Sequence, residues 1–140
     1  MPNTIRHRRL RDMSTVGIVL VSHSPKLAAG LADLLAQVAS DGVPVAVAGG
    51  TSDGRLGTDP DRIREAVAEV DRGDGVVVIP DLGSAVLAVK SVLEFLDGEV
   101  VLVDAPFVEG AVSAAVIAST GAPLDAVADA ARQARDVPKL

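Results

Sequence analysis

The sequence contains no cysteine, no tryptophan and no tyrosine, and only two phenylalanines among its 140 residues. The absence of cysteine excludes a disulfide framework, thiol chemistry and thiolate metal sites, and it favours a reducing compartment. Without large aromatic side chains, the interior must be built from aliphatic ones. Valine, leucine, isoleucine and alanine suit strands that helices bury on both faces.

Long apolar runs are also missing. No stretch approaches the roughly 18–20 residues that a membrane-spanning helix needs. No apolar run follows the basic N-terminus at the spacing of a secretory signal. We therefore predict a cytoplasmic protein that makes no membrane contact. The length is that of one globular domain.

Positive charge is scarce outside the N-terminus. The formal net charge is −6, although four arginines fall within the first dozen residues. Without residues 1–12, nine Lys and Arg face eighteen Asp and Glu, a balance of −9. An acidic body argues against a nucleic-acid partner, because affinity for a phosphate backbone comes from Lys and Arg. We expect residues 1–13 to form a disordered basic leader and residues 14–137 to form the domain.

Short apolar runs alternate with segments of helical periodicity. Buried strands are predicted at residues 16–21, 43–48, 76–79 and 100–103. Helices are predicted at about residues 25–38, 60–70, 82–96, 108–118 and 123–134. Helical spacing places one apolar stripe on the inner side of the first helix, made of Leu27, Leu31, Leu34, Leu35 and Val38. The alternation predicts an α/β fold: a small doubly wound, mainly parallel four-stranded sheet with helices on both faces.

Small and polar residues follow every predicted strand. In doubly wound sheets, ligands bind at the carboxyl ends of the strands, near the point where the strand order reverses. The residues at these ends are Ser22, His23 and Ser24, then Gly49, Gly50, Thr51 and Ser52, then Asp81, Leu82, Gly83 and Ser84, and finally Asp104, Ala105 and Pro106. The sequence therefore predicts the functional site at this edge of the sheet.

His23 is the only histidine outside the N-terminal segment. A neutral imidazole is nucleophilic near physiological pH, since its reference pKa is about 6.5. A phosphoryl group on His23 would face the free amide groups at the start of the first helix, and the hydroxyls of Ser22 and Ser24 could reach its oxygens. We predict that His23 accepts and passes on a phosphoryl group. The alternative is a solvated histidine in a loop.

A histidine nucleophile works best when an acceptor holds its second ring nitrogen. Asp81, after the third strand, is the best candidate for this acceptor, and Asp104 could take its place. Asp81 could instead, or in addition, be the N-cap of the following helix.

Residues 49–58 form a loop with four glycines. Its flexible amide groups could fold over a phosphate, or it could be a long mobile connection. The loop lacks the lysine of a P-loop, and no GxGxxG follows the first strand, which argues against ATP and dinucleotide sites. A zinc site needs three or four ligands, which one histidine without cysteine supplies poorly. The GxSxG motif of serine hydrolases is absent. We predict neither a metal nor a cofactor.

Four segments, spread in order over about residues 15–135, resemble a known family: VGIVLVSHSPKLAAGLADLLAQ, VAVAGGTSDGRLGTD, VVVIPDLGSAVLAVK and VLVDAPFVEGAVSAAVIAS. They look like the phosphotransfer subunit of dihydroxyacetone kinases driven by the phosphoenolpyruvate phosphotransferase system (PTS), within the mannose-type enzyme IIA family. The strongest pieces are VSHS, PDLGSA and APFVEGA.

The resemblance implies a phosphohistidine carrier. The phosphocarrier protein HPr would donate a phosphoryl group to His23, and His23 would pass it to ADP on the nucleotide-binding subunit of a dihydroxyacetone kinase. Asp81 matches the family's carboxylate beside the histidine. The residues that match positions near the phosphate are Gly49, Gly50, Thr51, Gly83 and Ser84. Relatives are dimers, so we expect a homodimer, with the apolar face of the third helix as a plausible surface.

Two alternatives to this role stay open. One is a sugar-specific mannose-type IIA unit that hands the phosphoryl group to a transporter subunit. The other is a binding or regulatory module in which His23 only contacts a ligand. Leu82 and Phe107 are candidate contacts for HPr, or they pack in the core.

Overall fold

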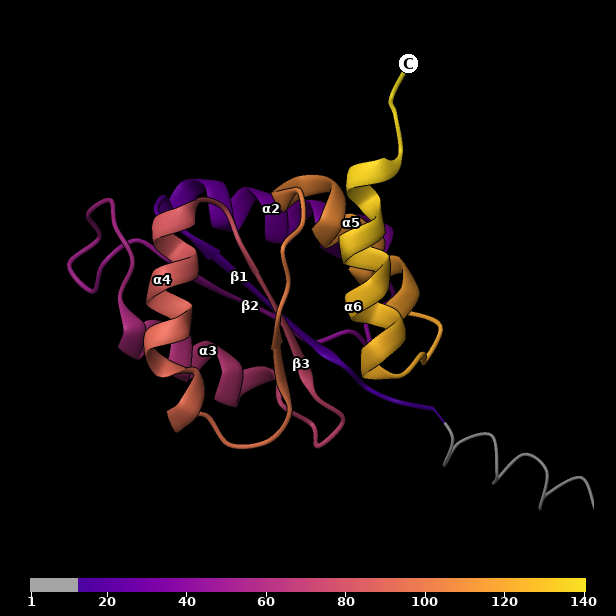
Figure 1. The fold of residues 1–140 in the computed structure, drawn as a ribbon, viewed down its shortest axis with the longest axis horizontal. Helices are drawn as coiled ribbons and strands as arrows, with labels where there is room; N and C mark the ends of the chain where they lie inside the picture. The colour runs from indigo at the N-terminus through magenta and orange to yellow at the C-terminus, as the bar shows by residue number, and fades with distance from the viewer. Residues whose placement is uncertain (1–12) are drawn as a thin grey trace, which may run out of the picture.

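The computed structural model describes residues 13–140 (Figure 1). All but the last residue of the predicted leader at 1–13 therefore lies outside the described residues. The elements in chain order are β1 (Gly17–Ser22), α2 (Pro25–Val38), β2 (Val45–Gly49), α3 (Pro60–Val70), β3 (Val76–Pro80), α4 (Gly83–Val92), β4 (Val100–Leu102), α5 (Phe107–Ala118) and α6 (Leu124–Gln133), with 3₁₀ turns at Leu93–Phe95 and Ala134–Asp136.

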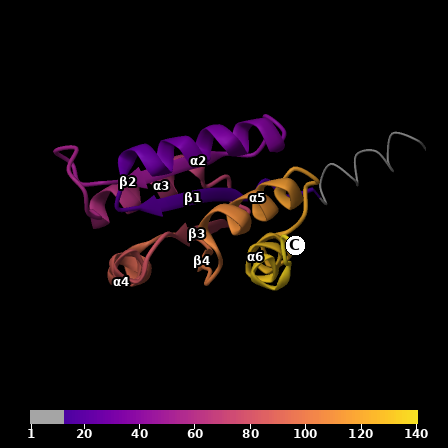
Figure 2. The ribbon, with the colours of Figure 1, turned by 90° about the horizontal axis from the view of Figure 1, so that it is seen from above.

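The four strands form one parallel sheet in the order β2-β1-β3-β4. Figure 2 shows the strands one below another in this order, with α4 and α6 on opposite sides of β4. Alternate residues of β1 enter different cores: Ile18 and Leu20 pack with α2, α5 and α6, whereas Val19 and Val21 pack with α3 and α4. The predicted doubly wound α/β fold is confirmed, and the sheet is wholly parallel.

The strand order reverses between β1 and β3. From β1 the chain moves outward to β2, then returns to the other side of β1 to form β3 and β4. The carboxyl ends of β1 and β3 therefore flank the point at which doubly wound sheets bind ligands. His23 follows β1 and Asp81 follows β3, so both lie at this point.

The predicted inner stripe of α2 is partly wrong. Leu31 and Leu35 are buried, but together with Ala28, while the other three residues of the stripe are 39–46% exposed: Leu27, Leu34 and Val38. Successive residues of a helix lie about 100° apart, so these three form a row beside the buried one. Ala28 lets the helix approach the sheet closely, and the outer row of larger side chains stays at the surface.

No helix within residues 13–140 is long and apolar enough to cross a bilayer.

The third predicted helix, at residues 82–96, is shorter than expected, because α4 ends at Val92 and a 3₁₀ turn continues the chain to Phe95.

Candidate functional site

His23 lies in the short connection between β1 and α2. Ser24 is the N-cap of α2, its hydroxyl accepts the amide N–H of Leu27 at 3.2 Å, and Pro25 is the first helical residue. A serine cap followed by proline is a typical helix start, which explains why the strand turns into a helix immediately after His23. The His23 side chain is 25% exposed, so the ring is partly open to solvent.

Asp81 reaches His23 from the neighbouring strand. Val21 of β1 pairs with Pro80 of β3, and the amide of Asp81 donates to the carbonyl of Val21 at 3.0 Å. The register thereby places the Asp81 carboxylate beside the imidazole, with Nδ1 of His23 3.0 Å from Oδ1. The Asp81 side chain is only 8% exposed.

Four donors hold the Asp81 carboxylate. Oδ1 accepts from the His23 ring and from the amide of Leu82 at 2.7 Å. Oδ2 accepts from the Ser22 hydroxyl at 2.9 Å and from the amide of His23 at 3.1 Å. Burial raises the pKa of Asp81, but the hydrogen bonds from the His23 amide, the Ser22 hydroxyl and the His23 ring outweigh burial and lower this pKa below its usual value. Asp81 is therefore ionised at neutral pH.

The ionised Asp81 fixes the tautomer of His23. A carboxylate can only accept hydrogen bonds, so Nδ1 must carry the proton and donate to Oδ1. In the neutral ring, Nε2 then carries the lone pair. Nε2 is hydrogen-bonded to the hydroxyl of Ser84, which donates to it. Nε2, the ring nitrogen that carries the lone pair, thus faces the start of α4.

The start of α4 leaves donors free at this point. Its N-cap is Leu82, which makes no side-chain capping bond. In the part of the chain that the structure describes, the amides of Gly83 and Ser84 have no acceptor. A Cβ at Gly83 would meet nothing within 4 Å, so the space above it is open. A pocket of about 510 Å³ continues from Asp81, Leu82 and Gly83 between α4 and β4.

Ser22 does not occupy the position expected of a phosphate ligand. It is fully buried, and its hydroxyl donates to Asp81 and accepts the amide N–H of Ser24 at 3.0 Å. A side chain with no exposed surface and an engaged proton has no donor left for a phosphoryl oxygen. The hydroxyl of Ser24 accepts a bond within α2, while its own proton keeps no partner among the described residues.

The glycine loop borders the other side of His23. The amide of Gly57 donates to the carbonyl of His23 at 2.9 Å. The amides of Gly50 and Thr51, expected near the phosphate, already donate to the carbonyls of Ser22 and Arg55. These two amides therefore shape the loop instead of facing an anion.

Gly49 and Gly50 are required by close packing. A Cβ at Gly49 would lie 2.9 Å from Cα of Pro25 at the start of α2. Gly50 has a positive φ of 72°, and a Cβ there would lie 2.6 Å from the carbonyl oxygen of Arg55. Both glycines let the end of β2 approach the connection that carries His23.

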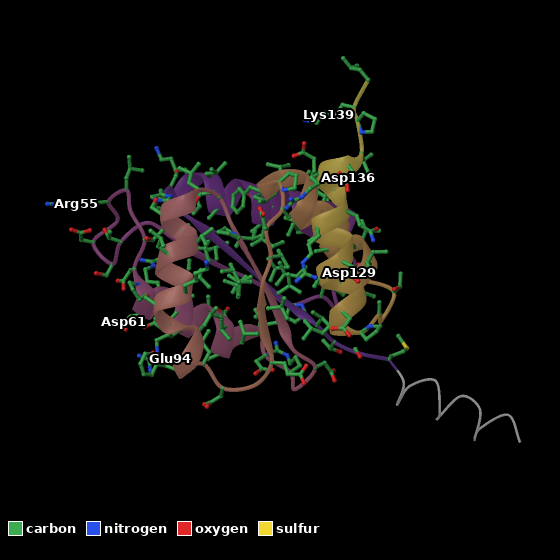
Figure 3. All side chains as sticks on the ribbon, in the orientation of Figure 1. Arg55, Asp61, Glu94, Asp129, Asp136 and Lys139 are labelled. Atoms are coloured by element: carbon green, nitrogen blue, oxygen red, sulfur yellow. The ribbon has the colours of Figure 1, made fainter. Side chains whose placement is uncertain are left out.

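Asp104 and Arg55 make no hydrogen bond or ion pair with His23 or Asp81. Asp104 is 96% exposed and pairs with Arg135 at 3.2 Å, so it does not replace Asp81. Arg55 pairs with Asp53 at 3.2 Å, and Figure 3 shows its side chain pointing away from the body of the molecule. Phe107 packs against the core, whereas Leu82 is 62% exposed next to the site. Among residues 13–140, no group of three or more His, Cys, Asp or Glu could hold a metal ion.

The role of Ser22 is the feature that sequence reasoning missed. Its signal was present: Ser22 directly continues the apolar run of the first strand, where a side chain is expected to be buried. A buried hydroxyl needs a hydrogen-bond partner, and the pairing of β1 with β3 places Asp81 opposite Ser22.

Comparison with known proteins agrees with this geometry. Residues 17–128 match the EIIA-man family, described as the PTS system fructose IIA component. The chain is 41% identical over 105 residues to the phosphoryl donor subunit DhaM of PEP-dependent dihydroxyacetone kinase 2 from Listeria innocua, covering 72% of this chain and 84% of that protein. It is 37% identical over 113 residues to the phosphotransferase subunit DhaM of the PTS-dependent dihydroxyacetone kinase from Lactococcus lactis, covering 81% and 90%.

Some relatives are much longer than this chain. The DhaM subunit of Klebsiella michiganensis is 37% identical over 132 residues, which cover 89% of this chain but 28% of that protein. Among solved structures, the crystal structure of the unknown-function protein EF1359 matches with a TM-score of 0.77 and 35% identity, covering 85% of this chain and 94% of that one. The fold is therefore shared with a protein of similar size.

Proposed function

This chain belongs to the EIIA-man family of PTS system fructose IIA components, and on that premise we propose that it is a phosphohistidine carrier of a dihydroxyacetone kinase. A role in phosphoryl transfer follows from the family and from relatives named as phosphoryl donor subunits. The finer assignment is ours: HPr donates to His23, and ADP on a kinase subunit accepts.

One observation carries this proposal. Asp81 holds Nδ1 of His23 and so leaves the lone pair on Nε2, which faces Ser84 and the open start of α4. In the first step, Nε2 attacks the phosphorus of phosphorylated HPr. The new N–P bond forms as the bond to the donor's imidazole breaks, and the donor ring leaves with its electron pair. Asp81 stabilises the positive charge that develops on the His23 ring.

The start of α4 suits the transferred group. The free amides of Gly83 and Ser84, together with the Ser84 hydroxyl, can donate to phosphoryl oxygens at the positive end of the helix. In the second step, an oxygen of the terminal phosphate of ADP attacks the phosphorus. The bond to Nε2 breaks, ATP forms, and His23 returns to its neutral tautomer.

Exposed leucines support a protein partner at this site. Leu82 is 62% exposed beside Asp81, and Leu56 is 77% exposed beside Gly57, whose amide contacts His23. A small transient interface with HPr needs little more than such a surface around the nucleophile. A cytoplasmic location, where HPr and ADP would be available, and a homodimer through α4 remain predictions.

The test is phosphorylation with phosphoenolpyruvate, enzyme I and HPr, read by intact mass. We expect one added phosphoryl group that is labile in acid, its loss in His23→Ala, and its retention in His7→Ala, which removes the other histidine. Adding ADP with the nucleotide-binding kinase subunit should then discharge the protein and produce ATP.

Three outcomes would count against the proposal. An unmodified wild-type chain would overturn the carrier role and favour a binding module. Modification that survives His23→Ala would move the site elsewhere. Discharge to a sugar-transporter subunit, but not to the kinase subunit, would favour the sugar-specific IIA unit, which the description of the matched family also fits.

A further inference from the structure

Ser22 has a position unlike that of any other polar residue that the structure describes. Among residues 13–140 it is the one polar residue that is buried, with no exposed surface. It ends β1 and lies between the connection carrying His23 and the end of β3. The proposed transfer step gives Ser22 no contact with the phosphoryl group, so its burial and bonding need another explanation.

The hydroxyl of Ser22 is held in one orientation. Its oxygen accepts the amide N–H of Ser24 at 3.0 Å, and its proton lies toward Oδ2 of Asp81 at 2.9 Å. Because a carboxylate cannot donate, Ser22 must be the donor in the second bond. The hydroxyl thus connects the backbone at the start of α2 to one specific oxygen of Asp81.

Ser22 binds Oδ2 of Asp81, whereas the His23 ring binds the other oxygen, Oδ1. The imidazole uses Oδ1, and rotation of the carboxylate about its Cβ–Cγ bond would carry Oδ1 away from Nδ1. This torsion is broad in aspartate, so side-chain preference alone would not fix it. The bond from Ser22 to Oδ2 resists the rotation, together with the amides of His23 on Oδ2 and of Leu82 on Oδ1; Ser22 is the one side-chain donor among these three. The Ser22 bond is also one of the bonds that lower the pKa of Asp81.

We propose that Ser22 is a positioning residue: its buried hydroxyl orients the Asp81 carboxylate so that Oδ1 keeps the proton of His23 on Nδ1 and leaves Nε2 as the nucleophile. The effect of Ser22 on phosphoryl transfer rests on the proposed function, whereas the predicted tautomer of His23 is a property of the unphosphorylated protein. It can therefore be measured without any transfer reaction.

Ser22→Ala is the decisive variant, with Ser119→Ala as its matched control. Ser119 likewise accepts a backbone N–H, from Ser40 at 2.9 Å, and donates to an oxygen, the carbonyl of Ala115 at 2.9 Å. It lies at the end of α5, away from His23. Ser22→Thr retains the hydroxyl and tests rescue.

The first measurement is ¹⁵N NMR of the His23 ring across pH in the unphosphorylated protein. In Ser22→Ala we expect a larger share of the tautomer protonated on Nε2, while Ser119→Ala keeps the wild-type spectrum. The second is the rate of phosphorylation by phosphorylated HPr, corrected for the folded fraction. Here Ser22→Ala should be about tenfold slower, the range seen when a residue that orients a site group is lost. Ser22→Thr should recover both signals.

A double variant tests whether Ser22 acts through Asp81. In the Asp81→Asn background, removal of the Ser22 hydroxyl should slow transfer no further, whereas independent effects that multiply would contradict the proposal. Wild-type tautomer and rate in Ser22→Ala, with only reduced stability, would make Ser22 a structural residue and overturn the inference. If Ser22→Ala does not fold, Ser22→Cys, of similar size but a weaker donor, decides by the same two signals. Failure of HPr to modify the wild type would overturn the carrier role but leave the NMR test standing.

Discussion

Helices α2 and α4 both begin at the site, but they begin in different ways. At the start of α2, Ser24 uses its hydroxyl on its own helix by accepting the amide of Leu27, and Pro25 removes one unpaired amide. At the start of α4, Leu82 offers no capping side chain. Asp81, the residue before this N-cap, accepts the amide N–H of Leu82, but its carboxylate also accepts hydrogen bonds from the His23 ring and the Ser22 hydroxyl.

This difference separates a structural helix start from one available to an anion. The first amides of any helix lack partners within the helix, and either a side chain or a ligand must satisfy them. In α2, Ser24 accepts the amide of Leu27 and Pro25 has no N–H, whereas in α4 the amides of Gly83 and Ser84 stay open near the Ser84 hydroxyl that meets Nε2 of His23. We expect the phosphoryl group to depend on α4 and the fold to depend more on α2.

The largest effect is expected from Asp81→Asn, which removes the negative charge that Asp81, just before the N-cap of α4, places beside His23. Asparagine cannot stabilise a positive imidazole, and its amide can hold either tautomer. Phosphorylation by HPr should slow on the order of 100-fold, as measured by rapid quench with phosphorylated HPr. Asp104→Asn, which alters an exposed strand-end carboxylate, is the matched control and should keep the wild-type rate.

Wild type and Asp81→Asn can also be compared in stability across pH. The pKa of Asp81 is lowered in the folded state, so its stabilising contribution is full above its unfolded pKa of about 3.9 and is lost as pH falls through the lowered value. The difference in unfolding free energy between wild type and Asp81→Asn should therefore shrink in acid.

In the transfer experiment, equal phosphorylation rates in wild type and Asp81→Asn, or an equal loss of rate in Asp104→Asn, would remove Asp81 from its proposed role.

A smaller effect is expected from Gly83→Pro, which makes the start of α4 resemble that of α2. Proline is well tolerated at the first position of a helix, and Leu82 already has the extended backbone that precedes proline, with φ −132° and ψ 168°. The substitution removes one amide donor, so the phosphorylation rate should fall about tenfold at unchanged unfolding free energy.

Gly83→Ala is the control for that change. Alanine keeps the amide, and its Cβ would meet no atom within 4 Å, so transfer should stay close to wild type. If the proline and alanine variants transfer equally fast, the amide of Gly83 does not contact the phosphoryl group.

The smallest effect on transfer is expected from Ser24→Ala, which removes the cap of α2. The free energy of unfolding should fall by about 1 kcal/mol, as for other N-cap serines, measured by urea denaturation. The phosphorylation rate should change less than about twofold. A rate loss as large as that of Gly83→Pro would show that Ser24 also binds the phosphoryl group, as the sequence alone suggested, and would erase the distinction between the two helices.

Local patterns predicted most of the fold. The four apolar runs and the helix starts at residues 25 and 60 are confirmed, because strand and cap signals depend on a few neighbouring residues. The family resemblance carried by VSHS and PDLGSA is confirmed as well. The inner stripe of α2 was wrong at Leu27, Leu34 and Val38, because periodicity does not say which of two adjacent rows faces the sheet.

The sequence predicted which residues form the site better than it predicted the hydrogen bonds between them. His23, Asp81 and Ser84 were expected at one edge of the sheet because each follows a predicted strand, and the structure brings them into hydrogen-bond contact. Their catalytic roles remain predictions. Ser22 was expected to face the phosphate, but it is buried and donates to Asp81. Its place after an apolar run indicated burial, whereas its bond to Asp81 depends on the pairing of β1 with β3.

The sequence by itself determined the succession of strands and helices, the polar ends of the strands and which histidine is proposed as the nucleophile. Only the tertiary structure decided that Oδ1 of Asp81 meets Nδ1, that Ser22 holds Oδ2, and that Nε2 faces α4. The physical reason is distance along the chain. These bonds join residues 58 and 59 positions apart, so they exist only once β1 and β3 have paired in one register.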